Sequence, residues 1–163
     1  MISMVVLIVG LVLSDPEAGL SLSLPDDWAS SDQTMAPGIT FTCGKLKATL
    51  SYGSVMGKGW TQLDVIRVNQ ERVREFMKAS GYSKQGAMEE IEASGAVLYR
   101  SWACAMKSDG DHVIYIVTAG WRTAERGTVN MFMEMRIERQ GALKFSEDEE
   151  RAIERLLRGF AFQ

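Results

Sequence analysis

The feature that most constrains this fold is a strict alternation of apolar and polar residues in short segments separated by turn residues. Leucines alternate with serines over residues 20–24, and apolar side chains alternate with threonines over residues 39–43. The same period of two recurs over residues 45–50 and 128–139. An alternation of this kind is typical of strands with two unlike faces, and the connections are short enough for antiparallel hairpins.

Further strands are predicted in the second half of the chain. Residues 87–92, 96–106 and 112–119 have the composition of strands, and Ser-Asp-Gly-Asp at 108–111 is a strong hairpin turn between the last two. These segments follow one another without an intervening helix. They therefore predict an antiparallel meander and argue against a doubly wound parallel fold.

Two helices are predicted by their capping residues. Thr61 with Asp64, and Ser146 with Glu149, have the spacing of a capping box, and Gly81 is a plausible end for the first helix. Apolar stripes at helical spacing are formed by Leu63, Ile66, Val73, Phe76 and Met77, and by Ile153, Leu156, Leu157 and Phe160. We therefore expect one α+β domain over residues 1–163, with an antiparallel sheet, N-terminal hairpins and two main helices.

Composition excludes several classes of protein. The chain of 163 residues is 46% hydrophobic, which disfavours disorder, and its net charge of −3 leaves no basic excess to neutralise nucleic-acid phosphates. The two cysteines, Cys43 and Cys104, cannot make a zinc cage alone. They are either buried free thiols or one disulfide. We expect no metal, no cofactor and no nucleic-acid partner.

The most apolar stretch, residues 4–13, has two interpretations. It is too short to span a membrane, so no integral membrane span is expected. It has the length of a signal-peptide core, but no Lys or Arg precedes Lys45; alternatively, its Val and Ile residues form a buried first strand. The strand interpretation predicts a cytoplasmic protein, and a signal peptide over residues 1–14 predicts a periplasmic or secreted one.

Catalytic chemistry is poorly represented. His112 is the only histidine, and Cys104 lies in an apolar strand, where thiols are usually inert. Glu89, Glu90 and Glu92 are better explained as part of a solvated edge strand than as paired catalytic carboxylates. The glycines of residues 53–59 lack the spacing of a phosphate-binding loop. We therefore predict no catalytic residue and no enzymatic activity.

Six residues are candidates for binding a partner. Trp28, Trp60 and Trp121 lie at or near predicted loops, where aromatic residues are typical interface anchors but equally often pack against the rim of a sheet. Met131, Met133 and Met135 form a row on one face of the last strand. That row is either core beneath a helix or, if open, a groove for an apolar peptide or helix.

The layout resembles the PsbP-like and DcrB-like α+β domain superfamily. The resemblance lies in the opening Gly-Leu-Ser-Leu-Ser-Leu-Pro-Asp-Asp-Trp at residues 19–28, in the closing helix and apolar tail at 151–162, and in the helix and meander between them. It implies a PsbP-like α/β/α sandwich, and a role in binding or stabilising other proteins. No functional residue can be carried over, because no site motif is shared.

The function expected is that of a non-catalytic protein-binding module, in particular a bacterial immunity or chaperone/adaptor protein that binds a toxin or secreted effector. One alternative is a small-ligand or enzymatic domain with a sheet–helix pocket that uses Tyr99, Arg100 and His112. A second alternative is a structural assembly subunit.

Overall fold

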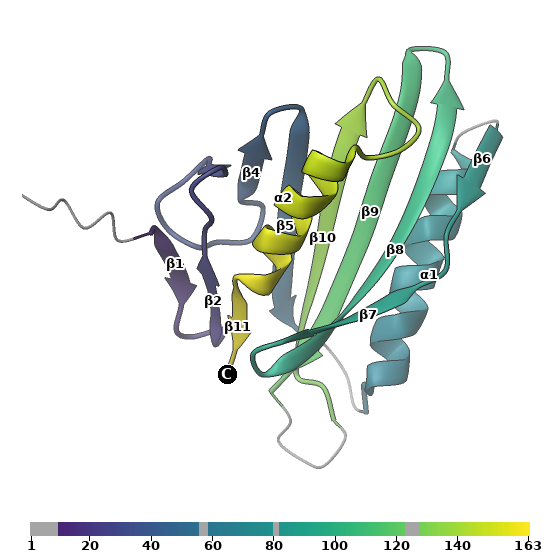
Figure 1. Ribbon diagram of the computed structural model, residues 1–163. Helices are drawn as coiled ribbons and strands as arrows, with labels where there is room; N and C mark the ends of the chain where they lie inside the picture. Colours follow the sequence, from purple (N-terminus) through teal and green to yellow (C-terminus); the bar gives the residue numbers. More distant parts are fainter. Residues whose placement is uncertain (1–9, 56–58, 80–81, 123–127) are drawn as a thin grey trace, which may run out of the picture.

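The computed structural model describes residues 10–55, 59–79, 82–122 and 128–163 (Figure 1). The helices are α1 (Gln62–Lys78) and α2 (Glu147–Arg158). The strands are β1 (Val12–Asp15), β2 (Leu20–Ser23), β3 (Ala29–Ser30), β4 (Thr40–Cys43), β5 (Leu46–Ser54), β6 (Tyr82–Gln85), β7 (Glu89–Ala93), β8 (Ala96–Lys107), β9 (Gly110–Trp121), β10 (Met131–Gln140) and β11 (Phe160–Phe162).

The strands form a large and a small sheet. The large sheet has the order β3-β4-β5-β10-β9-β8-β6, and β7 pairs with the part of β8 that β6 leaves free. The small sheet has the order β1-β2-β11. All of these strand pairings are antiparallel, which confirms the predicted α+β class.

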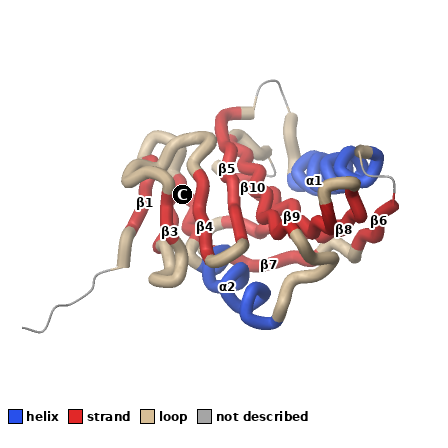
Figure 2. Tube along the Cα trace, turned by 90° about the horizontal axis from the view of Figure 1, so that it is seen from above, coloured by secondary structure: helices blue, strands red, loops and turns tan. Residues whose placement is uncertain are grey.

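Helices cover both faces of the large sheet, as Figure 2 shows from above. On one face, α2 packs its buried side chains into the main core together with the small sheet. On the other face, α1 contacts β6, β8 and β9. The alternation along β10 explains the layering, since Met133 and Met135 point into the main core while Glu134 and Arg136 point to the opposite face.

Helix α1 lies on the sheet through polar as well as apolar contacts. Asn69 is fully buried; its side-chain amide donates to the carbonyls of Tyr99 (2.8 Å) and Ile116 (3.0 Å), and its oxygen accepts from the Ser101 hydroxyl (2.6 Å). The predicted apolar stripe is therefore wrong at its first position. Leu63 is 76% exposed, because the inward face contains Asn69 and the buried Val65 and Val73.

Several predicted boundaries need correction. Residues 4–9 of the apolar N-terminal stretch lie outside the described residues. The end of the stretch does form a strand, because Val12 and Leu13 begin β1 and Leu13 is buried. The strand is not buried on both faces, since Val12 is 58% exposed at the edge of the small sheet, and Leu11 precedes it. The three glycines of residues 53–59 predict a flexible loop, but strand β5 extends through Gly53 and Ser54. The short strands β3, β6 and β11 were not predicted.

Candidate functional site

Burial removes the methionine row from the candidate surface. Met133 and Met135 are fully buried and Met131 is 8% exposed, all in the main core. The physical reason is that the small sheet and the apolar stripe of α2 pack into the same cluster, so this face of β10 is covered. The groove expected for an open row is therefore absent there.

Two of the tryptophans are also structural. Trp28 and Trp121 are 5% and 3% exposed. The indole N–H of Trp28 donates to the carbonyl of Ala152 in α2 at 3.0 Å, and that of Trp121 donates to the carbonyl of Ala18 at 2.9 Å. Each indole thus satisfies its single donor inside the protein. Both residues therefore pack inside the protein, in agreement with the packing interpretation of these tryptophans, and are too buried to anchor a partner.

Trp60 lies differently, at a groove between α1 and the sheet. Its ring meets the ring of Phe132 edge-on, with 5.6 Å between the ring centres, and both side chains are only half-buried. The groove has a volume of about 390 Å³. Residues of β5 and β10 form its floor, and its remaining walls include Val55, Trp60 and Arg72.

The groove exists because α1 does not extend across the whole sheet. Most contacts of α1 are to β6, β8 and β9, and α1 reaches β10 through the ion pair of Arg72 with Glu134. Gly53 pairs with Phe132 across the strands, and the space above its Cα is open. The aromatic ring of Phe132 therefore lies beside a position that has no side chain.

Charge at the groove is concentrated in one ion-paired group. The guanidinium of Arg72 contacts the carboxylate of Glu134 at 2.8 Å and that of Glu75 at 3.1 Å. These carboxylates hold the pKa of Arg72 above its ordinary value, with Glu134 as the main cause. The arrangement combines aromatic surface with a fixed charged pair, which is suited to recognition; the groove offers no thiol or imidazole for nucleophilic or acid–base chemistry.

The alternative site of Tyr99, Arg100 and His112 is not assembled. Neighbouring residues of a strand point to opposite faces, so Tyr99 packs with Val65 of α1 while Arg100 lies on the α2 side. His112 contacts Phe76 of α1. The expectation of a convergent polar site from these three residues is therefore wrong.

Arg100 is instead a buried cation on the α2 side of the sheet, paired with a carboxylate at the surface. Its guanidinium lies 4.5 Å from the ring centre of Tyr115 and pairs with the Glu89 carboxylate. The Tyr115 hydroxyl donates to Glu150 at 2.9 Å, and burial raises the pKa of Tyr115. The sequence had suggested a solvated edge for Glu89, which is exposed but also anchors this cation.

The cysteines form no disulfide. Cys104 is buried, and Cys43 is partly buried with its pKa raised by desolvation, which disfavours a reactive thiolate. Among the described residues, no group of three or more His, Cys, Asp or Glu side chains could hold a metal ion. Within the same residues, neither helix is long and apolar enough to cross a membrane.

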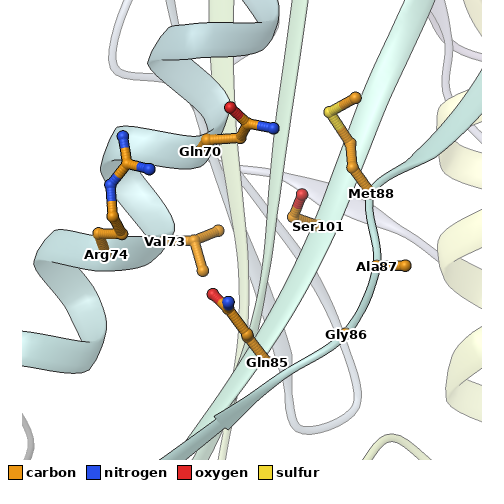
Figure 3. Close-up of a pocket in the computed structure, with 8 residues that line it drawn as sticks. All are labelled: Gln70, Val73, Arg74, Gln85, Gly86, Ala87, Met88 and Ser101. Carbon is orange, nitrogen blue, oxygen red and sulfur yellow. The ribbon is translucent and has the colours of Figure 1, made fainter.

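A second concave site lies on the other side of α1. This cleft has a volume of about 330 Å³ and separates α1 from residues 85–88, which are the end of β6 and its connection to β7. Figure 3 shows Gln70 and Arg74 on the helix, Gln85 and Met88 on the connection, and Ser101 of β8 between them. The sequence contains no signal for these residues, because Gln70 and Arg74 have the pattern of a solvated helix face and Gln85 that of an exposed polar residue.

A close contact fixes the connection that forms this cleft. The backbone N–H of Gly86 donates to the carbonyl of Trp102 at 3.0 Å. A Cβ atom at Gly86 would lie only 1.7 Å from the Trp102 indole nitrogen, so a larger residue does not fit without movement. The wall of the cleft can lie this close to Trp102 because residue 86 has no side chain.

The layered arrangement of two helices on an antiparallel sheet defines a PsbP-like fold. The chain is similar in structure to LpqN, described as involved in cell envelope biogenesis of Mycobacterium tuberculosis, with 12% identity, a TM-score of 0.62, and coverage of 88% of this chain and 83% of that one. It is also similar to the cyanobacterial PsbP (CyanoP) of Synechocystis sp. PCC 6803, with 16% identity, a TM-score of 0.54, and coverage of 98% and 96%.

A third similar structure comes from Bacteroides thetaiotaomicron VPI-5482, with 14% identity and a TM-score of 0.57. It covers 96% of this chain, which spans about half (49%) of the length of that protein. No protein-family model matches the sequence, and no curated protein matches it either. At these identities the similarity establishes the fold, and it confirms the predicted PsbP-like sandwich.

Proposed function

We propose that this protein is a non-catalytic protein-binding module and that its partner binds in the Trp60 groove. The observation that supports this most directly is the half-exposed Trp60–Phe132 pair beside the Arg72–Glu134 ion pair. Trp and Arg are the residues most enriched among side chains that dominate binding energy at protein interfaces. Neither aromatic ring is needed to close the main core, since both lie outside it.

The chemistry of the groove specifies what the partner presents. A large apolar or aromatic side chain fits against Val55, Trp60 and Phe132, where it gains burial and ring contacts. Polar groups next to that side chain face the Arg72–Glu134 pair and the serines of β5. We therefore propose a protein partner with one apolar anchor residue flanked by hydrogen-bonding groups.

Site-specific photo-crosslinking tests the proposal. A photoreactive amino acid at position 132, which lines the groove, is compared with the same amino acid at Leu143, an exposed hydrophobic residue outside the groove. In the native host, we expect one protein to crosslink in stoichiometric yield at position 132 and not at 143. Crosslinking at 143 alone, or at neither position, would overturn the proposal.

A narrower form of the proposal is that the protein is a bacterial immunity or chaperone/adaptor protein for a toxin or secreted effector. It is supported by small size and a net charge of −3, because acidic surfaces attract basic partners at low salt. Co-expression with the crosslinked partner tests it: an immunity protein suppresses the toxicity of the partner, and a chaperone keeps it soluble. If neither effect is seen and both proteins belong to a stable complex, the assembly-subunit alternative holds.

A further inference from the structure

The cleft between α1 and residues 85–88 is independent of the Trp60 groove. Arg72 faces the groove and Arg74 faces the cleft, so the two sites lie on different sides of the same helix. The cleft volume of about 330 Å³ falls within the range of about 300–1,000 Å³ that is typical of small-molecule sites. A small ligand could therefore bind there without touching the protein-binding groove.

Arg74 is an uncommitted cation at this cleft. The other arginines of the two helices all form ion pairs: Arg67, Arg72, Arg151, Arg155 and Arg158. Within the described parts of the chain, Arg74 forms neither an ion pair nor a hydrogen bond. A guanidinium presents parallel N–H donors that match the two oxygens of a carboxylate.

Two carboxamides face the cleft from opposite walls. Gln70 comes from α1 and Gln85 from the end of β6, and neither side chain bonds to another described residue. Each carboxamide has an acceptor oxygen and two donor hydrogens, which together complement the N–H and C=O of an amide. Val73 and Met88 add apolar surface beside them.

The deepest part of the cleft is already held in place. The Ser101 hydroxyl donates to Asn69 at 2.6 Å, and Asn69 is fixed by two backbone carbonyls of the sheet. The opposite wall is held by the contact of Gly86 with Trp102. These contacts fix the backbone that forms the cleft walls before a ligand arrives, so the ordering cost of binding falls on the exposed side chains of Gln70, Arg74 and Gln85.

We propose that this cleft binds a small organic carboxylate that also has an amide and an apolar side chain, such as an N-acylated amino acid. The carboxylate pairs with Arg74, and the amide bonds to Gln70 and Gln85. The apolar side chain packs against Val73 and Met88. This is a small-molecule function in addition to the proposed binding of a protein.

Calorimetric titration of the full chain tests the proposal with N-acetyl-leucine, N-acetyl-leucinamide, acetate and inorganic phosphate. We expect N-acetyl-leucine to bind with a millimolar dissociation constant or a lower one. The uncharged N-acetyl-leucinamide is expected to bind at least about 10-fold more weakly, because it cannot form the charge-assisted pair with Arg74. Acetate and phosphate are expected to bind more weakly than N-acetyl-leucine. Equal affinity for the carboxylate and the amide would overturn the proposal, as would the absence of binding or tighter binding of phosphate.

Matched variants place the ligand in the cleft. Arg74→Gln is expected to weaken N-acetyl-leucine binding by at least about 10-fold. Arg67→Gln removes the same charge from the same helix, at a residue that pairs with Asp64 outside the cleft, and is expected to leave affinity unchanged. Equal effects of the two substitutions would show non-specific attraction of an anion and would contradict the cleft.

Discussion

Asn69 shows how one buried polar residue positions a whole helix. It makes three hydrogen bonds between α1 and the sheet at a point where its side chain has no contact with solvent. Such a residue fixes the register of the helix, because any sliding or rotation leaves buried donors and acceptors without partners. It also supports the floor of the cleft between α1 and residues 85–88 through Ser101.

We therefore expect Asn69→Ala to lower the free energy of unfolding by about 2–3 kcal/mol, since it removes three buried hydrogen bonds and leaves the Ser101 hydroxyl without its acceptor. Urea denaturation measures this effect. Gln70→Ala, at the neighbouring exposed position of the same helix, is the control and is expected to cost less than about 0.5 kcal/mol. If Asn69→Ala and Gln70→Ala lower the free energy of unfolding equally, the hydrogen bonds of Asn69 do not stabilise the fold.

His112 gives a prediction about pH at the same scale. Burial is the main cause that lowers its pKa from the ordinary 6.5, Lys107 adds to this effect, and Glu138 and Asp109 oppose it. The unfolded chain therefore binds more protons than the folded chain just below pH 6.5. Stability is lost as pH falls through that value, with a slope of at most about 1.4 kcal/mol per pH unit for this group.

The measurement is the free energy of unfolding of the wild type and of His112→Gln between pH 7.5 and pH 5. The variant is expected to show a shallower decline than the wild type in the window that starts near pH 6.5. Parallel curves for the two proteins would mean that His112 has the same pKa in both states.

At the scale of elements, the connection between β6 and β7 determines whether the cleft exists. Both strands pair with β8, and between them the chain comes so close to Trp102 that Gly86 has no space for a Cβ. Gly86→Ala is expected to destabilise the protein by about 1–3 kcal/mol through overpacking. Thermal or urea unfolding measures the loss.

Gly53 in β5 is the matched control for this prediction. Nothing lies within 4 Å of a Cβ built there, so Gly53→Ala is expected to change stability by less than about 0.5 kcal/mol. If both glycines tolerate alanine equally, the close contact with Trp102 does not constrain the connection.

At the scale of the whole molecule, alternation and capping residues were enough to predict most of the fold. Alternation assigned Met133 and Met135 to one face of β10, but it could not show what covers that face, because α2 and the small sheet reach it from distant parts of the sequence.

Alternation also places Tyr99 and Arg100 on opposite faces of β8. The sequence alone therefore argues against a polar site formed by Tyr99, Arg100 and His112. Strand β6 has only four residues and no clear apolar period, which explains why it was missed.

The candidate site was predicted in part, through Trp60. Its partner Phe132 lies 72 positions further along the sequence. The pairing of β10 with β5 and the hydrogen bond from the Val129 N–H to the Trp60 carbonyl bring the two rings to one groove. The cleft could not be predicted, since it depends on where α1 sits relative to a short connection. The residues that line the groove and the cleft are of common types, and only the folded structure shows that they lie together.

The most direct test of the central claim is the dissociation constant of the crosslinked partner for three forms of this protein. Trp60→Ala is expected to raise the constant by at least about 10-fold, as is typical of an aromatic anchor. Leu143→Ala, which removes an exposed apolar side chain outside the groove, is expected to leave it unchanged. A Trp60→Ala protein that is folded and binds as tightly as the wild type would contradict a function based on this groove.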